Sequence, residues 1–330
     1  MDASDAFYDL RVWILGALAL SLLVGEVAIP SSELIIVALM VQMTLSMDGL
    51  SISKEMLSEN RRGMLLSVLL CYGVNAGITL AVGALFLMAG HEAMWEGWVL
   101  LAAMPCAISV VTAAILTKGD LNIAVVAVTS TYVSGIALAP AMSFFLIGSA
   151  VSPLEILKYI VLFIAVPAAL TIPLRKLRLD RRVKVPVINL MMALLLFLSV
   201  SPNRDYVVAY PTTVAIVLVA AGGRLLALAA LSRWMNKRLR TGRKSVPVYH
   251  VLCVWKNTGL SVSMCMLLLS GAPESVIPCF VCMMVESLWF SMYTRRHSAD
   301  ADVARRNASA SPWICGGWPR RSAWPRPRTG

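Results

Sequence analysis

The chain has 330 residues, of which 58% are hydrophobic and 14% are charged, and its mean hydropathy is +0.76. A soluble domain carries about 25% charged residues, so this composition excludes an ordinary soluble protein and leaves no room for a separate soluble catalytic domain. The net charge is +11, yet the Lys and Arg residues lie in short connections between apolar runs, a pattern typical of membrane topology rather than of nucleic-acid binding.

Apolar runs recur along the chain from the N-terminal region to residue 293. An α-helix needs about 20 apolar residues to cross the hydrocarbon core of a bilayer. We expect a transmembrane helix at each of ten runs: 11–29, 34–53, 63–89, 97–117, 121–147, 153–174, 186–201, 206–234, 246–270 and 274–293. Acidic rather than basic residues precede the first run, which predicts a retained span and not a cleavable signal. The predicted fold class is all-α integral membrane.

Basic residues gather in every second connection. They follow the second, fourth, sixth, eighth and tenth predicted spans, whereas the alternate connections are mainly acidic, with Arg204 as their one basic residue. Because loops rich in Lys and Arg stay in the cytoplasm, we predict a multi-pass protein of the cell membrane with both termini cytoplasmic. Residues 1–294 would form the transmembrane domain. Residues 295–330 lack apolar periodicity and are rich in Pro and Arg, which predicts a disordered cytoplasmic tail.

Two predicted spans contain residues that a plain lipid-facing helix does not tolerate. Pro105 lies about 12 Å into the fourth span and removes a backbone hydrogen bond there. Lys256, Asn257, Thr258 and Gly259 lie about 15 Å into the ninth span, where a lysine is costly and indicates a functional site. Each interrupted span is the fourth of five, and five-helix halves insert in opposite orientations. The pattern predicts two inverted repeats whose discontinuous helices four and nine cross at the midplane.

Other polar residues inside the predicted spans are further candidates for a solute or ion site. Glu286 lies about 18 Å into the tenth span, at the level of Lys256, which allows an ion pair between them; the alternative is that Glu286 neutralises Arg224. Lys256 either releases and rebinds a proton or attracts an anionic solute, and both roles stay open. Arg224 is only nine residues from Arg233, close enough to snorkel to the cytoplasmic interface, and we expect a mainly structural role for it. The full candidate set is Asn75, Pro105, Cys106, Ser109, Thr112, Lys256, Asn257, Thr258 and Glu286.

The segments MPCAISVVTAAILTKGD and LNIAVVAVTSTYVSGIALAP, together with WKNTGLSVSM in the ninth span, resemble the bile acid:sodium symporter superfamily, which also contains the arsenite-efflux carriers. The resemblance covers most of residues 10–293. It implies a panel domain from the helices near 11–53 and 153–201, a core domain from those near 63–147 and 206–293, and a solute cavity between the two domains.

Departures from the family pattern bear on ion coupling. The family has a basic residue followed by glycine, with which Lys118 and Gly119 align. In this alignment, the positions where sodium-coupled members carry ion ligands hold apolar residues here: Val110, Val111, Ala124, Val128 and Leu252. None of these side chains offers the oxygen that a hard cation needs. In the light of the resemblance, we expect a sodium-independent carrier in which Lys256 replaces the coupling ion.

The function predicted by these residues is secondary active transport of a small solute by alternating access, with an organic anion favoured by Lys256. We expect membrane lipid as a partner, and no cofactor, metal centre, nucleic-acid partner or enzymatic activity. Two alternatives stay open. Cys106 stands where the arsenite-efflux branch has a metalloid-binding thiol, although Gly259 stands where that branch has a glutamate. A receptor or scaffold is the other alternative, and it would not require two matched helix breaks.

Overall fold

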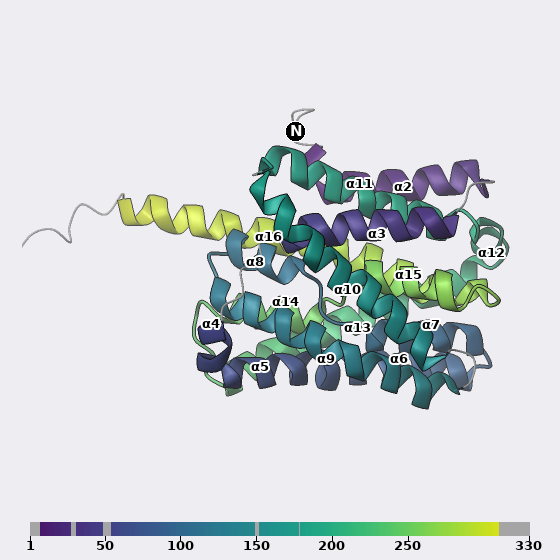
Figure 1. Ribbon diagram of the computed structural model, residues 1–330, viewed down its shortest axis with the longest axis horizontal. Helices are drawn as coiled ribbons and strands as arrows, with labels where there is room; N and C mark the ends of the chain where they lie inside the picture. The colour runs from purple at the N-terminus through teal and green to yellow at the C-terminus, as the bar shows by residue number, and fades with distance from the viewer. Residues whose placement is uncertain (1–6, 28–30, 49–53, 149–151, 178, 310–330) are drawn as a thin grey trace, which may run out of the picture.

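The computed structural model describes residues 7–27, 31–48, 54–148, 152–177 and 179–309. Throughout these ranges every regular element is a helix, and most of the helices lie side by side along one direction (Figure 1). Each of the ten predicted apolar runs falls on one helix or on consecutive helices in its described part. The prediction of an all-helical membrane fold is therefore confirmed.

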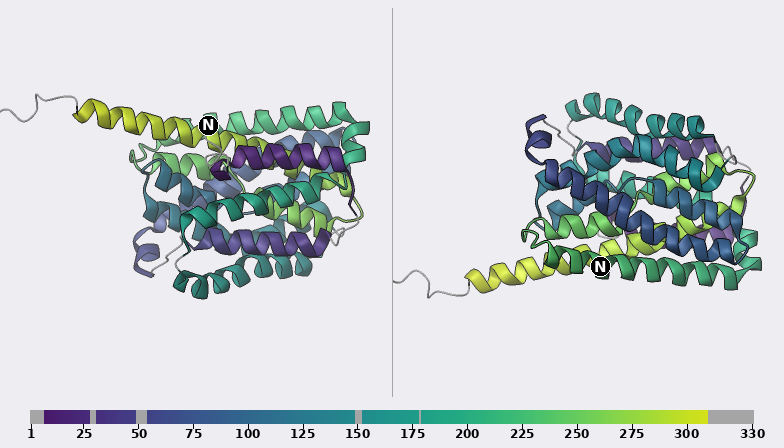
Figure 2. Two further views of the ribbon diagram at one scale, coloured as in Figure 1. Left: turned by 90° about the horizontal axis from the view of Figure 1, so that it is seen from above. Right: turned by 90° about the horizontal axis from the view of Figure 1, so that it is seen from below.

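Four helices form one side of the bundle, and we call them the panel helices: α2 (Leu10–Val24), α3 (Ser31–Met47), α10 (Pro153–Lys176) and α11 (Arg181–Val200). Helix α11 packs against α2 and α3, and α10 packs against α3. In the left view of Figure 2 they follow one another in the order α2, α11, α3, α10. The panel helices therefore form a layer of their own.

The second group, which we call the core helices, packs beside this layer. It consists of α5 (Arg61–Val68), the π-helix η1 (Leu69–Asn75), α6 (Ala76–Met88), α7 (Glu92–Ala103), α8 (Ser109–Leu116), α9 (Leu121–Ile147), α13 (Pro211–Arg238), α14 (Val246–Val254), α15 (Thr258–Leu268) and α16 (Val276–Ser309). Shorter helices lie in the connections: α4 (Lys54–Glu59), α12 (Arg204–Ala209) and η3 (Pro273–Ser275).

Within the described ranges, six helical stretches are long and apolar enough to cross a membrane: Arg61–Met88, Leu121–Ile147, Pro153–Lys176, Arg182–Val200, Pro211–Arg238 and Pro273–His297. Helices α2, α3 and α15 are apolar but shorter. Large apolar side chains point outward from several of these elements, and Phe145, Leu154 and Val219 are each at least 75% exposed. Such surfaces are rare on soluble proteins, so a lipid environment accounts for them.

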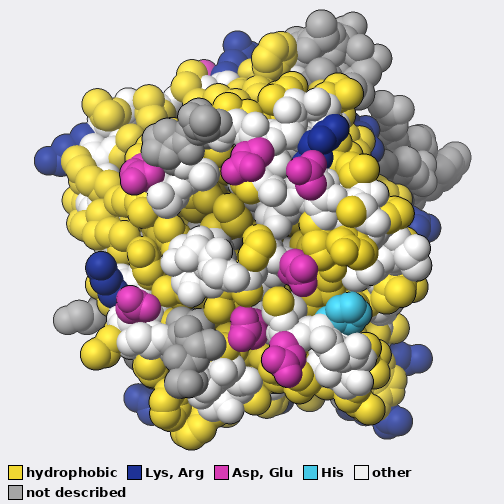
Figure 3. Space-filling model, turned by 90° about the vertical axis from the view of Figure 1, so that its right-hand side faces the viewer, with side chains coloured by type: hydrophobic (Ala, Val, Ile, Leu, Met, Phe, Trp, Pro, Cys, Tyr) yellow, Lys and Arg dark blue, Asp and Glu magenta, His cyan; other side chains and the backbone are white. Residues whose placement is uncertain are grey.

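Charged side chains separate between the two ends of the bundle. Figure 3 looks onto the end that carries α12, where Asp and Glu side chains gather and few Lys or Arg side chains lie. Lys118 and Lys244 lie in connections at the opposite end, where Lys184 lies in the first turn of α11 and Arg295 lies on α16. We call this second end the basic end. The separation matches the alternation of basic and acidic connections in the sequence.

The C-terminal helix corrects one expectation. Helix α16 continues to Ser309 and projects beyond the bundle (Figure 1), so residues 295–309 are helical rather than disordered. Residues 298–309 include Ala and Arg, which are strong helix formers, and no Pro or Gly interrupts them. The rest of the expected tail, residues 310–330, lies outside the described residues.

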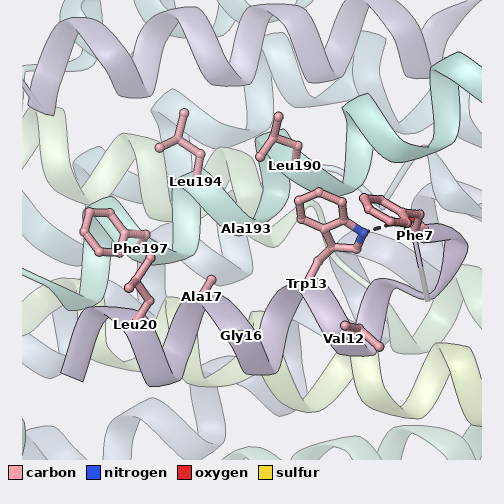
Figure 4. A pocket seen from close by; sticks show the side chains of 10 residues that line it. All are labelled: Phe7, Val12, Trp13, Gly16, Ala17, Leu20, Leu190, Ala193, Leu194 and Phe197. Carbon is pink, nitrogen blue, oxygen red and sulfur yellow. Dashed lines mark hydrogen bonds between the residues drawn. The ribbon is translucent and has the colours of Figure 1, made fainter. Parts of the chain in front are cut away.

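An apolar groove of about 570 Å³ follows the outer face of the panel between α2 and α11 (Figure 4). Trp13 and Phe7 lie at one end of it and Phe197 at the other. The Trp13 indole N–H donates to the Phe7 carbonyl oxygen at 2.9 Å, so the ring's only polar group is already satisfied. The groove therefore offers apolar contacts alone, as suits a surface in lipid.

Candidate functional site

Helix α7 ends at a proline, as the sequence predicted. Pro105 has no N–H with which to continue the hydrogen-bond ladder. It also restricts the residue before it to extended backbone, and Met104 has φ −73° and ψ 154°. The helix resumes as α8 at Ser109. The predicted interruption of the fourth span is therefore confirmed.

Helix α14 ends at Val254 without a proline. The next residue, Trp255, is extended with φ −111° and ψ 117°. Helix α15 then begins behind Asn257, whose Oδ1 atom accepts a hydrogen bond from the Leu260 N–H at 3.1 Å. Asparagine is among the best N-cap residues because its side chain satisfies a free N–H of the first turn. The ninth span is thus interrupted at the residues that the sequence indicated.

The two interrupted helices meet at their extended residues, and we call this place the crossover. Cys106 and Lys256 form an isolated antiparallel bridge. The Asn257 N–H donates to the Pro105 carbonyl oxygen at 2.8 Å, and the Ala107 N–H donates to the Trp255 carbonyl oxygen at 3.1 Å. Inside a membrane domain no bulk water can satisfy these backbone groups, so the mutual pairing is what permits both breaks.

Lys256 is completely buried, and its ammonium lies against the C-terminal end of α7. Its Nζ atom donates to the carbonyl oxygens of Ala102 at 2.8 Å and Met104 at 2.7 Å. The same atom lies 3.4 Å from the Cys71 sulfur and 4.6 Å from the centre of the Tyr72 ring. The end of a helix leaves carbonyl groups unpaired and carries partial negative charge. The ammonium therefore caps α7 and neutralises that end.

Glu286 does not pair with Lys256, which corrects one of the two expectations. Its Oε1 atom accepts a hydrogen bond from Arg224 Nη1 at 2.6 Å. Arg224 is 1% exposed, so it is bound inside the core and does not snorkel to the interface. The physical reason is that α13 turns Arg224 toward α16, while carbonyl groups of α7 already bind Lys256.

Asn75, at the end of the π-helix η1, links this ion pair to the crossover. Its Oδ1 atom accepts a hydrogen bond from Arg224 Nη2 at 3.0 Å. Its Nδ2 atom donates to the carbonyl oxygens of Cys253 at 2.8 Å and Val254 at 3.2 Å, the last residues of α14. Each half-helix that ends at the crossover is therefore capped by a side chain, α7 by Lys256 and α14 by Asn75.

A small cavity of about 40 Å³ lies between the crossover and the panel helices. Gln42 and Ser46 of α3 line it on one side, and Ser109, Thr258 and Gly259 line it on the other. A larger cavity of about 800 Å³ shares part of this lining, including Ser46 and Ser109, and continues to the basic end. The two cavities adjoin each other between the panel and core helices, and the larger one reaches from the basic end toward the crossover.

The sequence-predicted candidates divide into two groups. The cavity lining includes Ser109, Thr112, Lys256, Asn257 and Thr258. The lining does not include Asn75, Pro105, Cys106 or Glu286, which build or support the crossover. The Cys106 sulfur is buried 3.1 Å from the Thr131 hydroxyl oxygen. Within the first group Ser109 and Thr112 are accessible from the cavities, whereas Lys256 is completely buried behind them; the second group positions the backbone.

Several residues of the site were missed by the sequence interpretation. Tyr132 accepts a hydrogen bond from Asn257 Nδ2 at 2.7 Å, and Cys71 and Tyr72 surround the Lys256 ammonium. Gln42 and Ser46 line the cavity from the panel side. Gln42 carried a usable signal, since it is a lone amide in the apolar run of the second span. The tyrosines and the cysteine carried none, because such residues are common in membrane helices.

A family model described as the sodium bile acid symporter family matches residues 33–210, which is 178 of 330 residues and more than half of the chain. No curated protein matches the chain. The matched segment contains the first helix break and ends before the second, so Lys256 lies outside it. Together with the apolar helical fold, the match shows that the chain belongs to the sodium bile acid symporter family.

Proposed function

We propose that this protein is a secondary carrier that moves a small organic anion by alternating access, without sodium. The observation that carries the proposal is the position of Lys256, whose ammonium lies 2.7 and 2.8 Å from two carbonyl oxygens at the broken helix α7. In transporters of this kind, unwound backbone carbonyls are where coupling cations bind. The Lys256 ammonium is part of the protein and already lies at such carbonyl groups. This position supports a mechanism that needs no coupling cation from solution.

The architecture in this proposal is ten spans in two inverted five-helix repeats, with both termini in the cytoplasm. Its support is the pair of matched breaks, α7–α8 and α14–α15, which stand at equivalent places in the two halves and meet in antiparallel pairing. The segregation of charge supports the orientation, since the basic end would face the cytoplasm. The cavity that opens toward the basic end would then be the inward-facing state of the carrier.

The solute would bind where the half-helices α8 and α15 begin. Neither the Ser109 N–H nor the Gly259 N–H donates a hydrogen bond to any residue that the structure describes. Free N–H groups at helix N-termini favour anions through their partial positive charge. Ser109 and Gly259 both line the small cavity. This arrangement favours an anionic solute that is held by neutral groups.

Lys256 would act as a fixed charge rather than as a proton relay. Its ammonium is bound by carbonyl oxygens. Glu286, the carboxylate that the sequence places at the same depth as Lys256, is bound to Arg224 instead. Direct contacts to carbonyl oxygens, rather than to a carboxylate, support a fixed charge at this position. The Lys256 charge adds to the positive potential behind the solute site.

Reconstituted vesicles test this proposal with a panel of labelled organic anions that also contains arsenite. The wild type should accumulate at least one organic anion, and Lys256→Gln should reduce its initial rate by tenfold or more, on the order expected for loss of a preorganised charge. Lys237→Gln, which removes an exposed lysine near the basic end, is the matched control and should transport normally. Uptake of arsenite alone, abolished by Cys106→Ser, would replace the proposal with the metalloid alternative.

A further inference from the structure

Two buried cysteines of the core helices lie in contact with each other. Cys265 lies on α15 and Cys279 on α16, and both carry free thiols. Their Sγ atoms are 3.4 Å apart. A disulfide bond is about 2.05 Å long, so the two sulfur atoms would have to approach each other by only about 1.4 Å to form one. The fold has therefore already brought together two residues that are 14 positions apart in the sequence.

Close packing around Cys279 holds its thiol in this place. The Cys279 S–H donates to the Gly97 carbonyl oxygen of α7 at 3.4 Å. Helix α7 can approach so closely because Gly97 has no side chain, and a Cβ atom at that position would overlap the Ser275 carbonyl oxygen of η3. Three elements, α7, η3 and α16, thus meet without space between their backbones. The Cys279 sulfur has little freedom to turn away from Cys265.

A cavity of about 280 Å³ leads from the surface to Cys265. It is separate from the cavities at the crossover and lies at the end of the bundle that carries α12, the end that faces the viewer in Figure 3. Its lining includes the exposed residues Ser32, Ser270 and Pro273 as well as Cys265, which is 1% exposed. One water molecule takes up about 30 Å³ in the liquid, so the cavity has room for a molecule as small as hydrogen peroxide.

We propose that Cys265 and Cys279 form an oxidisable dithiol that closes to a disulfide bond when a small hydroperoxide enters this cavity. The O–O bond of hydrogen peroxide breaks, the Cys265 sulfur takes up a hydroxyl group as sulfenic acid, and the other oxygen leaves as water. The Cys279 sulfur then displaces that hydroxyl group, which leaves as a second water with the Cys279 proton. Two thiols and one hydrogen peroxide thus give one disulfide bond and two water molecules.

The bond would tie the half-helix α15 to α16. A cross-link between residues 14 positions apart restricts the unfolded chain and so stabilises the folded one. It also stops oxidation at a reversible stage, because a sulfenic acid that meets no second thiol is oxidised further to irreversible products. In the orientation of the proposed function this end faces the outside, where disulfide bonds persist. Formation of the bond does not depend on that orientation.

The test treats the purified full chain in detergent micelles with hydrogen peroxide. The thiols that remain are blocked with N-ethylmaleimide in denaturant, and the digested peptides are identified by mass spectrometry. We expect a pair of peptides joined through Cys265 and Cys279 in most molecules, and separation of this pair by dithiothreitol. The oxidised wild type should melt about 5 °C above the wild type reduced with dithiothreitol, as expected for a disulfide that closes a loop of this length.

Three variants show which sulfur atoms carry the effect. Cys265→Ser and Cys279→Ser each remove one partner, so peroxide should no longer raise the melting temperature of either variant. Cys282→Ser is the matched control, because it changes another buried thiol three residues further along α16. It should keep both the cross-link and the rise in melting temperature.

Peroxide treatment that leaves Cys265 and Cys279 unlinked, or that joins Cys279 to Cys282 instead, overturns the proposal. A cross-link that leaves the melting temperature unchanged overturns the stabilising role. The wild type alone gives both measurements, so the test survives a variant that fails to fold. Neither measurement involves transport. A cross-linked protein that moves no organic anion therefore contradicts only the proposed function, and an active carrier without the cross-link contradicts only the present proposal.

Discussion

Arg224 and Glu286 form an ion pair 2.6 Å apart that is buried among the core helices, and Lys256 has no part in it. The core helices thus hold two buried cationic side chains with different partners among the described residues. A carboxylate neutralises Arg224, whereas only carbonyl groups, a thiol and an aromatic ring surround the Lys256 ammonium. The Lys256 charge is therefore the one that the proposed carrier would use in place of an ion.

The first prediction concerns the buried pair. Glu286→Gln leaves the Arg224 guanidinium buried without a counter-charge, which should destabilise the protein by about 3–5 kcal/mol. The double variant Arg224→Met with Glu286→Leu removes both charges and should melt closer to the wild type than either single variant does. Thermal melting in detergent checks the order. Equal melting temperatures for the single variants and the wild type would show that the pair is not energetically coupled.

The second prediction concerns the cap on α14. Asn75→Leu leaves the carbonyl groups of Cys253 and Val254 unsatisfied and also removes an acceptor from Arg224. We expect a loss of about 1–3 kcal/mol in stability and a fall in transport rate, because the crossover is no longer held in place. Ser263→Ala removes a hydroxyl that bonds only within α15 and serves as the control. An Asn75→Leu protein that is less stable but transports at the wild-type rate would limit Asn75 to a structural role.

The third prediction concerns pH at the basic end. Asp9 accepts hydrogen bonds from Arg11 at 2.6 Å and from Arg295 at 2.9 Å, which joins the start of α2 to α16. The Arg11 guanidinium, against the opposing effect of burial, holds the pKa of the Asp9 carboxyl below its usual value, and the Arg295 charge acts in the same direction. The carboxylate therefore stabilises the fold above its unfolded pKa of about 3.9, and this stabilisation is lost as pH falls through the folded pKa.

Asp9→Asn keeps an N-cap residue but removes the charge, so it isolates this effect. The wild type should melt above the variant near neutral pH by no more than about 1 kcal/mol equivalent, since both arginines are partly exposed. The difference should shrink as the pH falls below the unfolded pKa of about 3.9 and through the lower folded pKa. Melting curves of both proteins at several pH values check this, and a constant difference across the range would contradict it.

The fourth prediction uses the gap at Gly259. An added Cβ would lie at ordinary contact distances, 3.4 Å from Gln42 Oε1 and 3.5 Å from Leu195 Cδ1, so Gly259→Ala should fold normally. The methyl group would nevertheless occupy the space between α15 and Gln42. We expect a KM for the transported anion that rises by about tenfold with little change in melting temperature, on the scale of one lost solute contact. An unchanged KM would place the solute elsewhere along the cavity.

The crossover shows which features of the site could be predicted from the sequence and which could not. Pro105 and the polar run from Lys256 to Gly259 predicted both breaks, because a missing N–H and a midspan charge have direct physical consequences in a bilayer. The sequence did not determine the partner of Lys256. Counting residues along a span places Glu286 at the same depth in the bilayer as Lys256, but it does not show toward which neighbouring helix the Glu286 side chain points. Backbone carbonyl groups leave no trace in the residue pattern. For the same reason the caps on α7 and α14 could be found only in the structure.

The panel side of the site was harder to predict for a different reason. Gln42 and Ser46 lie on an uninterrupted helix, and the sequence marks interruptions more clearly than it marks which face of a helix meets another domain. The tail shows the converse limit. The loss of apolar periodicity after position 294 suggested disorder, yet α16 continues to Ser309 over residues that include the strong helix formers Ala and Arg and no Pro or Gly.

The most direct test of the central claim is the initial rate of organic anion uptake into vesicles with sodium present and with sodium replaced by choline. If the Lys256 ammonium stands in for the coupling cation at the carbonyl groups of Ala102 and Met104, the wild type should transport at the same rate in both conditions. Uptake that stops when sodium is removed would contradict the account, because a dissolved cation would then do what is assigned to the lysine.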